Sequence, residues 1–410
     1  MEKFSELLEK YAELTVKTGV NIQTDQTLVI NSPIECAEFV RLIAKNAYKL
    51  GAKNVHVEWN DEELTLIKYL NAPEKAFKDF PLWKADGYEQ LAKGGAAFLS
   101  ISASNPELLK AVDPKKIAEA NKARSIALKN YREYIMNSTV AWSVVSIPTK
   151  GWAKKVFPAL SEKDAVEKLW DYIFKIVRVD KTDSIKAWNE HLKNINEKTE
   201  FLNKQKLKTL HFVSTDTDLT IQLPKNHLWA GGGEYNKKRT YFVANIPTEE
   251  IFTLPLKAGV NGKVKSTKPL NYGGNLIDNF TLTFKDGKVI NFSAEQGYET
   301  LKKLIETDEG SHYLGEVALV PHDSPISNSN IIFYNTLFDE NASCHLALGM
   351  AYPSCIEGGS EMTEEQLKEF GANTSLIHED FMIGSSDLDI IGETNTGEKI
   401  QIFKNGNWAF

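Results

Sequence analysis

Residue types that bind metal ions or move protons gather in short segments of the second half of the chain. The segments and their polar residues are NIPTEEIFTLP (245–255) with Glu249 and Glu250, SHYLGEVALVP (311–321) with Glu316, FDENASCHLALGMAYP (338–353) with Asp339, Glu340, His345 and Tyr352, and SLIHEDFMIGSSD (375–387) with His378 and Asp380. Carboxylates combined with imidazoles form a mixed oxygen and nitrogen ligand set that suits Zn²⁺, Co²⁺ or Mn²⁺. These residues therefore predict a metal site in the C-terminal half.

Their spacing suggests how they come together. In a strand, residues two positions apart face the same side, so His378 and Asp380 would project together. If residues 345–352 form a helix, His345 and Tyr352 lie seven positions apart and share one face of it. Glu340, in the segment that leads into this helix, reaches the same region.

The chemistry of such a cluster is hydrolytic. Two divalent ions about 3.5–4 Å apart bind a water between them, lower its pKa and hold a peptide carbonyl for attack. A carboxylate then serves as general base, and a tyrosine hydroxyl stabilises the oxyanion.

Each motif also has a simpler interpretation. A single glutamate before a strand is usually a surface or capping residue, and a lone histidine is more often hydrogen-bonded in a core than bound to a metal. Tyr352, directly before Pro353, fits a packed aromatic at a helix end. Cys344 beside His345 raises the alternative of a cysteine nucleophile. Consecutive residues of a helix point about 100° apart, so we expect Cys344 to be a buried structural thiol instead.

Other catalytic signatures are missing from the sequence. It contains no GxxxxGK[ST], GxGxxG, HExxH or GxSxG motif. The glycine cluster LWAGGGEYNKKR (228–239) has the composition of a phosphate-binding loop, with Lys237, Lys238 and Arg239 after its glycines. The same pattern is more often a flexible loop with a solvated basic end, and that interpretation is favoured.

The elements that must position these residues follow from periodicity. Residues 2–17 and 35–50 have helical spacing, while QTLVINSP (26–33) and VHVEW (55–59) have strand composition, which predicts a βαβ unit. AAFLSISAS (96–104) and VAWSVVSIP (140–148) read as further strands, with helical segments at 106–135 and 161–205. The first domain is therefore expected to be α/β with a parallel or mixed sheet.

The second half of the chain has a different pattern of residues. Short β-rich runs recur from LHFVST (210–215) through TYFVANIP (240–247) to the C-terminus, and Asp286-Gly287 in FKDGKV marks a hairpin. We therefore predict an N-terminal α/β domain at 1–205 and an α+β catalytic domain at 206–410, with the charged helix of 161–205 at the boundary.

The amino-acid composition argues against several classes of protein. The formal charge is −7 over 410 residues, which gives no basic face for nucleic acid. The three cysteines form no CxxC pair, which indicates a reducing compartment. The N-terminus is charged, and no uncharged apolar run reaches about 18 residues, so neither a signal peptide nor a membrane helix is expected. A cytoplasmic location is predicted.

The segments NIPTEEIFTLP, FDENASCHLALGMAYP and HEDFMIGSSDLDI together strongly resemble the thermophilic aminopeptidases of peptidase family M29, the aminopeptidases T and S. The resemblance covers essentially the whole chain, and its most specific parts are the FDENxxCHLALG and HxDFMIGS blocks. It implies that Glu250, Glu316, His345, His378 and Asp380 bind two divalent metals (zinc, cobalt, magnesium or manganese), with Glu340 a further ligand. It also implies that Glu316 is the bridging or general-base carboxylate and Tyr352 the catalytic tyrosine.

The resemblance further implies a cytoplasmic homodimer that acts on short peptides from a site enclosed with the partner subunit. Glu249 and Asp339 are candidates for binding the α-ammonium of the substrate. Two alternatives stay open at this point: a dinuclear hydrolase of phosphate esters or other amides, and a non-enzymatic protein with a structural metal.

Overall fold

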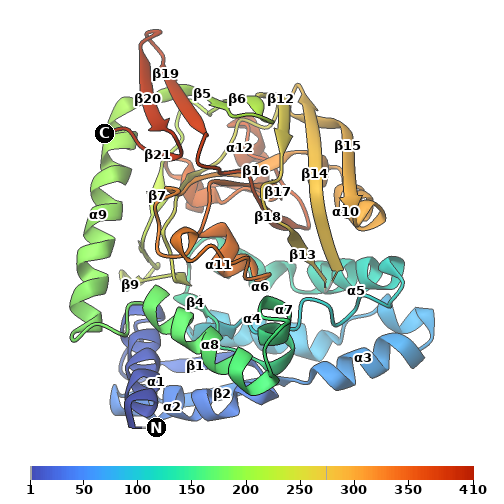
Figure 1. Cartoon of the computed structure of the whole chain (residues 1–410), viewed down its shortest axis with the longest axis vertical. Helices are drawn as coiled ribbons and strands as arrows, with labels where there is room; N and C mark the ends of the chain where they lie inside the picture. Colours follow the sequence, from blue (N-terminus) through green and yellow to red (C-terminus); the bar gives the residue numbers. More distant parts are fainter. Residues whose placement is uncertain (1, 274) are drawn as a thin grey trace. The chain divides into compact units, whose positions relative to one another are not determined.

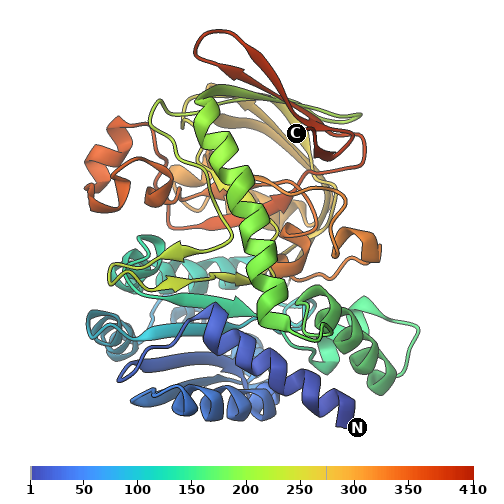
Figure 2. The same cartoon turned by 90° about the vertical axis from the view of Figure 1, so that its left-hand side faces the viewer.

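The structure is a computed structural model that describes residues 2–273 and 275–410 (Figure 1). The chain divides into two compact units. The first contains Met1–Asn194, Gly232–Thr248 and Phe333–Leu337, and the second contains Ile195–Gly231, Glu249–Ile332 and Phe338–Phe410. The division falls inside α9 (Ser184–Gln205), the long green helix of Figure 2.

The first unit is built on a parallel sheet with the strand order β10-β4-β3-β1-β2. Its strands are β1 (Thr27–Pro33), β2 (Asn54–Asn60), β3 (Ala97–Ile101), β4 (Trp142–Val145) and β10 (Asn245–Ile246). The predicted βαβ unit is confirmed, because β1 and β2 pair in parallel, with Leu28 opposite Val55.

Helices cover both faces of this sheet. They are α1 (Glu2–Leu14), α2 (Ala37–Lys49), α3 (Glu62–Asn71), α4 (Leu82–Lys93), α5 (Pro114–Ala127), α6 (Lys129–Met136), α7 (Lys150–Val156) and α8 (Glu162–Ile176). Val29 and Phe98 pack against side chains of α4 and α6, while Leu28 and Ile30 point to the opposite face and are also fully buried. Burial on both faces is what a parallel sheet requires, and the predicted α/β class is confirmed.

The run TYFVANIP departs from its expected place in the second half of the fold. Its first strand, β9 (Tyr241–Phe242), pairs with β8 (Glu234–Tyr235), and its second strand, β10, joins the parallel sheet of the first unit beside β4. The glycine cluster leads into this hairpin, whose turn is formed by Lys237 and Lys238 and is followed by Arg239. Composition indicates a strand, but the partner of a strand depends on contacts far away in the sequence.

The second unit contains a sheet with the order β18-β17-β16-β11-β7 and a larger sheet in which β13-β14-β12-β6-β5-β19-β20-β21 are neighbours and β15 pairs with β14. The smaller sheet is made of β7 (Ala230–Gly231), β11 (Ile251–Thr253), β16 (Leu314–Leu319), β17 (His345–Gly349) and β18 (His378–Met382). The larger sheet is made of β5 (Leu207–Val213), β6 (Asp218–Gln222), β12 (Val260–Lys265), β13 (Leu270–Tyr272), β14 (Asn275–Lys285), β15 (Lys288–Gln296), β19 (Asp389–Thr394), β20 (Lys399–Lys404) and β21 (Asn407–Trp408). The helices of the second unit are α10 (Tyr298–Ile305), α12 (Glu364–Glu369) and parts of α9 and of α11 (Thr336–Glu340).

One buried apolar cluster joins the two sheets of this unit. Val317 and Leu346 of the smaller sheet belong to the same cluster as Phe212 and Leu282 of the larger sheet. One face of the smaller sheet therefore packs in the core, and its other face is available for polar side chains.

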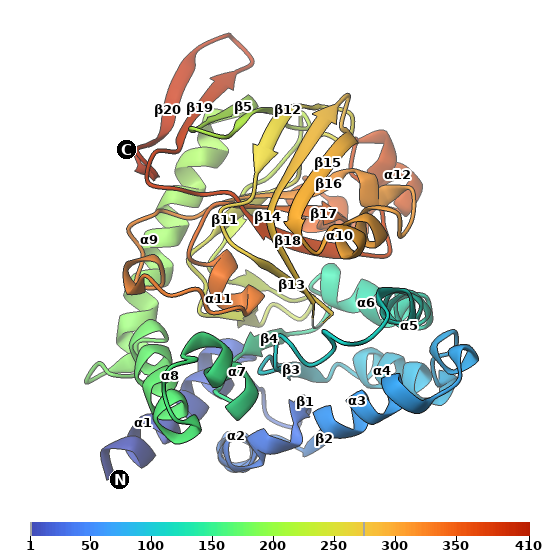
Figure 3. The ribbon, with the colours of Figure 1, turned by 45° about the vertical axis from the view of Figure 1, so that its right-hand side comes forward.

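The predicted hairpin at Asp286-Gly287 is present and joins β14 to β15, with α10 following (Figure 3). Asp286 and Gly287 have φ values of +49° and +82°. Positive φ at both central residues is the requirement of the turn that Asp-Gly favours in hairpins.

The helix considered for residues 345–352 does not form. Residues 345–349 are instead strand β17, paired with β16 on one side and β18 on the other. A short apolar run such as HLALG fits a buried strand as well as a buried helix, and the neighbouring strands decide between them. His345 and Tyr352 therefore do not share a helix face.

Candidate metal centre

The candidate site lies on one face of the sheet β18-β17-β16-β11-β7. Glu316 of β16 is opposite Ala347 of β17, which is opposite Asp380 of β18. Directly opposite residues of antiparallel strands project to the same face, as do residues two positions apart on one strand. Glu316, His345, His378 and Asp380 therefore share one face, and the strand geometry predicted for the last two is confirmed.

The alternate residues of the same strands face the other way. Val317, Leu346 and Phe381 are at most 1% exposed and lie in the core between the sheets. Because this face of the sheet is anchored by the core, the backbone beneath the polar face is held in place.

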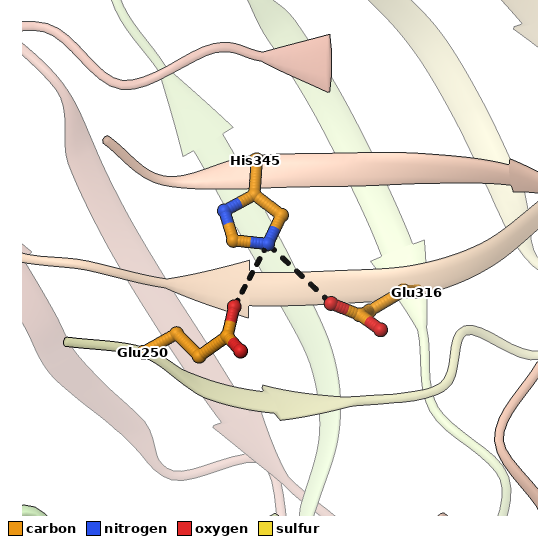
Figure 4. Close-up of side chains that lie close together, drawn as sticks. All are labelled: Glu250, Glu316 and His345. Carbon is orange, nitrogen blue, oxygen red and sulfur yellow. Dashed lines mark ion pairs between the residues drawn. The ribbon is translucent and has the colours of Figure 1, made fainter. Parts of the chain in front are cut away.

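Glu250, Glu316 and His345 form the first group of the cluster (Figure 4). The Nε2 atom of His345 lies 3.1 Å from Oε2 of Glu250 and 3.4 Å from Oε1 of Glu316. Glu250 directly precedes β11, so this group draws on three neighbouring strands, and all its members are buried.

Glu316, His378 and Asp380 form the second group. The Nε2 atom of His378 lies 3.5 Å from Oε2 of Glu316 and 3.6 Å from Oδ1 of Asp380. Glu316 thus belongs to both groups and directs a different oxygen to each histidine.

Hydrogen bonds fix the orientation of both imidazoles. The Nδ1 atom of His345 lies 3.0 Å from the backbone oxygen of Glu340 and 3.1 Å from that of Ser343, and Nδ1 of His378 lies 2.7 Å from the backbone oxygen of Met350. A carbonyl oxygen only accepts, so Nδ1 carries the proton in each ring. In the neutral imidazole, Nε2 then presents its lone pair to the carboxylates, which is the arrangement of histidines that bind metals.

The pKa values of the clustered groups indicate that the carboxylates attract added positive charge. Burial by itself raises the pKa of Glu316, but hydrogen bonds from His345 and His378 outweigh it and lower this pKa to about 2. Against the effect of burial, the neighbouring carboxylates raise the pKa of His378 to about 9 and that of His345 well above its usual value. Burial raises the pKa of Asp380 to about 6. Protons on the imidazoles or a divalent cation supply the missing charge.

The donor set fits a divalent cation. Among the described residues, Oδ1 of Asp380 is a buried carboxylate oxygen without a hydrogen-bond partner. Burying a carboxylate oxygen that accepts no hydrogen bond costs free energy unless a cation binds it. The ligand atoms of each group lie within 4.8 Å of one another, and the set of oxygen and nitrogen donors without thiolate is typical of catalytic sites.

Glu340 and Tyr352 lie beside these groups. Burial and the charges of Asp380 and Glu250 raise the pKa of Glu340 well above its usual value, which places its carboxylate near the cluster although it belongs to neither group. The ring of Tyr352 packs edge-on against His378, with ring centroids 5.0 Å apart. The structure therefore brings five of the six predicted ligands into the two groups and packs the ring of Tyr352 against His378, while Glu340 belongs to neither group.

Glu249 and Asp339 are both buried, with exposed fractions of 8% and 1%. The side chain of Asn341 accepts a hydrogen bond from the backbone N–H of Glu249 at 2.7 Å and donates one to Oε1 of Glu340 at 3.3 Å. No role was predicted for Asn341 from the sequence. Its one signal there is its place within the DENxxCH block, beside a predicted ligand.

Cys344 takes no part in the polar face. Its Sγ donates to the backbone oxygen of Val320 at 3.3 Å, and burial raises the pKa of the thiol to about 12. A thiol that stays protonated is a poor nucleophile.

Comparison with known proteins shows the family of the chain. The model of the family described as thermophilic metalloprotease (M29) matches residues 4–408. Aminopeptidase 2 of Geobacillus stearothermophilus is 56% identical over 410 residues, covering 100% of this chain and 99% of that protein, and aminopeptidase AmpS of Bacillus subtilis is 54% identical over 100% of both. The structure of wild-type AmpT from Thermus thermophilus superposes with a TM-score of 0.91 at 38% identity, over 99% of this chain and 100% of that one.

The family match extends over nearly the whole chain, and the carboxylate and histidine cluster is the kind of donor set that a metalloprotease requires. The resemblance seen in the sequence is confirmed, and the expected class of enzyme, a hydrolase, is confirmed with it. The chain belongs to the thermophilic metalloprotease family M29.

Proposed function

We propose that this protein is an aminopeptidase that releases N-terminal amino acids from short peptides, with two divalent cations held by the cluster around Glu316. The observation that carries the proposal is the position of Glu316, which directs Oε1 to His345 and Oε2 to His378. A carboxylate shared by two ligand groups is the arrangement of a paired metal site. The names of the relatives, all aminopeptidases, support removal of single N-terminal residues.

The residues divide into roles by their geometry. Glu250 and His345 would hold one cation, His378 and Asp380 the other, and Glu316 both, with Glu340 as a further ligand. Zinc, cobalt, magnesium or manganese at this position would acidify a water molecule and polarise the peptide carbonyl.

The remaining steps belong to protein side chains. Glu316, which borders both groups, is placed to accept the proton of the attacking water. The phenol of Tyr352, whose ring packs on His378, would donate to the oxyanion that develops on the peptide carbonyl. Glu249 and Asp339 are the candidate partners of the α-ammonium group of the peptide.

A phosphatase is less well supported. The charges that act on Glu316 and Asp380 come from the two histidines and from other carboxylates. Lys238 and Arg239, the basic residues first considered for phosphate, belong to the β8–β9 hairpin of the first unit. A peptide carbonyl, unlike a phosphate, needs no cationic clamp.

The location and assembly remain predictions. Over the described residues, no helix is long and apolar enough to cross a bilayer. From the sequence resemblance we infer a cytoplasmic homodimer that admits short peptides. Sedimentation velocity at micromolar concentration tests the dimer, and a monomer would contradict it.

One experiment tests the activity directly. Purified protein loaded with zinc, cobalt or manganese is incubated with a mixed library of short peptides, and the products are read by mass spectrometry. We expect ladders that shorten one residue at a time from the N-terminus. Internal cleavage, release from the C-terminus or no cleavage with any of these metals would refute the proposal.

A further inference from the structure

A small apolar cluster, separate from the core between the two sheets, lies next to the candidate metal centre. Its buried members are Leu254, Ala351, Cys355, Ile356, Leu367 and Ala372. Phe252, Tyr352 and Met362 pack against this cluster but keep part of their surface exposed.

Phe252 lies on the same face of the sheet as the candidate ligands. It is two residues beyond Glu250, and in the register of the sheet it is opposite Ala318, which is opposite His345. Both relationships place its side chain on the ligand face. The small side chain of Ala318 separates Phe252 from His345 in this row.

An aromatic contact connects this cluster to the metal centre. The ring of Phe252 lies 5.6 Å from that of Tyr352, and the ring of Tyr352 lies 5.0 Å from that of His378, measured between centroids. The partly exposed rings of Phe252 and Tyr352 therefore meet beside the metal centre, and Met362 packs on the same buried cluster.

Apolar surface beside a polar site is what a ligand pocket presents. Leaving such surface in contact with water is unfavourable, and a site that binds an apolar group recovers that free energy when the group covers it. In aminopeptidase chemistry, the carbonyl that is attacked carries the α-carbon of the first residue. The side chain of that residue therefore branches one atom away from the reacting carbonyl and contacts the protein directly beside the metal centre.

We propose that Phe252 and Met362 line the subsite for the side chain of the N-terminal residue and select apolar side chains such as leucine and phenylalanine. Tyr352 forms the inner end of this subsite. The inference rests on the aminopeptidase activity proposed above and specifies which peptides that activity prefers.

The expected size of the preference for apolar N-terminal residues follows from how strongly a hydrophobic pocket can discriminate between substrates. One methylene group in such a pocket changes kcat/KM by roughly 10- to 200-fold at best. We therefore expect leucyl substrates to be favoured over alanyl substrates by at least about 10-fold, and lysyl and aspartyl substrates to be poorer than both.

The test compares ratios of kcat/KM between amino-acid p-nitroanilides for the zinc- or cobalt-loaded full chain. Phe252→Ala and Met362→Ala should each reduce the leucine-to-alanine ratio by about 5-fold or more, because each removes part of a hydrophobic pocket. The control is Phe370→Ala, an exposed aromatic residue at the end of α12 that packs outside the cluster. It should leave the ratio unchanged.

Metal content and circular dichroism are measured for every variant. If Phe252→Ala does not fold, Phe252→Leu and Met362→Ala provide the test. A wild-type preference for lysyl or aspartyl substrates, or a ratio that neither folded variant changes, would overturn this inference while leaving the aminopeptidase intact. No release of any amino acid by the wild type would refute the proposed function itself.

Discussion

The Nδ1 atom of His378 lies 2.7 Å from the backbone oxygen of Met350, so the position of this imidazole is set by a main-chain group that no side-chain substitution removes. The bond leaves Nε2 directed at Glu316 and Asp380. A histidine held in this way is prepared for a cation, because its tautomer and ring plane are fixed before the cation binds.

Replacing the shared carboxylate should abolish activity without unfolding the protein. Glu316→Ala removes a carboxylate from both ligand groups, and His345→Ala removes the imidazole nitrogen from the first group. We expect kcat/KM on leucine p-nitroanilide to fall at least about 10³-fold, the order of loss when a group that acts in the transition state is removed. Circular dichroism should stay native. His211→Ala, at a half-exposed histidine of β5, is the matched control. Wild-type rates in metal-replete Glu316→Ala protein would rule out this assignment.

The tyrosine should act on turnover rather than on metal binding. Tyr352→Phe keeps the ring that packs on His378 and removes only the hydroxyl. We expect kcat to fall about 10²-fold, as for other oxyanion donors, with KM and metal content nearly unchanged. Steady-state kinetics and inductively coupled plasma mass spectrometry measure the three quantities. A variant with normal kcat would show that Tyr352 serves only in packing.

Asn341 should support the ligands through its hydrogen bonds. Asn341→Leu has a similar shape but loses the contacts to the Glu249 N–H and the Glu340 carboxylate. We expect metal affinity to fall about 10- to 100-fold, as for other groups that orient ligands. The free energy of unfolding should fall by about 1–3 kcal/mol, because a buried N–H is left unsatisfied. Competition with a chelator and urea denaturation measure the two effects. Unchanged affinity would limit Asn341 to a structural role.

Removing the metal should separate catalysis from folding. Dialysis against a chelator is expected to abolish peptidase activity and to preserve the circular-dichroism spectrum, since both sheets of the second unit are anchored by an apolar core. Readdition of zinc, cobalt or manganese should restore activity. The melting temperature should rise with metal concentration, because the cation binds only the folded cluster. Unfolding on chelation would indicate a structural metal instead.

Stability should decrease with rising pH through a carboxylate of the first unit, Glu234. Burial raises the pKa of Glu234 from 4.5 to about 7, although a hydrogen bond from Ser138 lowers it in part. The folded chain therefore holds this proton more tightly than the unfolded chain. The stabilisation is complete below pH 4.5 and is lost as pH rises towards 7, by about 1–3 kcal/mol.

Urea denaturation of wild type and Glu234→Gln at several pH values tests this sign. Between pH 4.5 and about 7, the free energy of unfolding of the wild type should fall relative to that of Glu234→Gln as pH rises. Glu295→Gln, at an exposed residue of β15, should follow the wild type. A constant difference between wild type and Glu234→Gln would contradict the prediction.

Much of the fold could be read from local patterns. The alternation of helical and strand periodicity in the first 60 residues predicted β1, α2 and β2, and the Asp286-Gly287 turn predicted the β14–β15 hairpin. These features depend on neighbours in sequence, where propensity and turn chemistry act. The division at residue 205 stays a prediction about domains that fold independently.

Features that depend on distant contacts were harder to predict. Strand β10 joins the parallel sheet from a position far along the chain, and residues 345–349 form a strand where a helix had been considered. In both cases local composition allowed more than one structure. The neighbouring strands selected one of them by completing backbone hydrogen bonds.

For the site itself, the sequence determined the chemistry: which carboxylates and imidazoles are present, that they suit a divalent metal, and that the chain resembles a metallopeptidase family. Only the tertiary structure decided that Glu316 lies between His345 and His378 and that the rings of Phe252 and Tyr352 meet. The tertiary structure alone also decided that Asn341 connects Glu249 to Glu340. The physical reason is that residue types are local properties, whereas the distances between side chains are set by strand register. That register is fixed by the packing of apolar residues on the opposite face of the sheet.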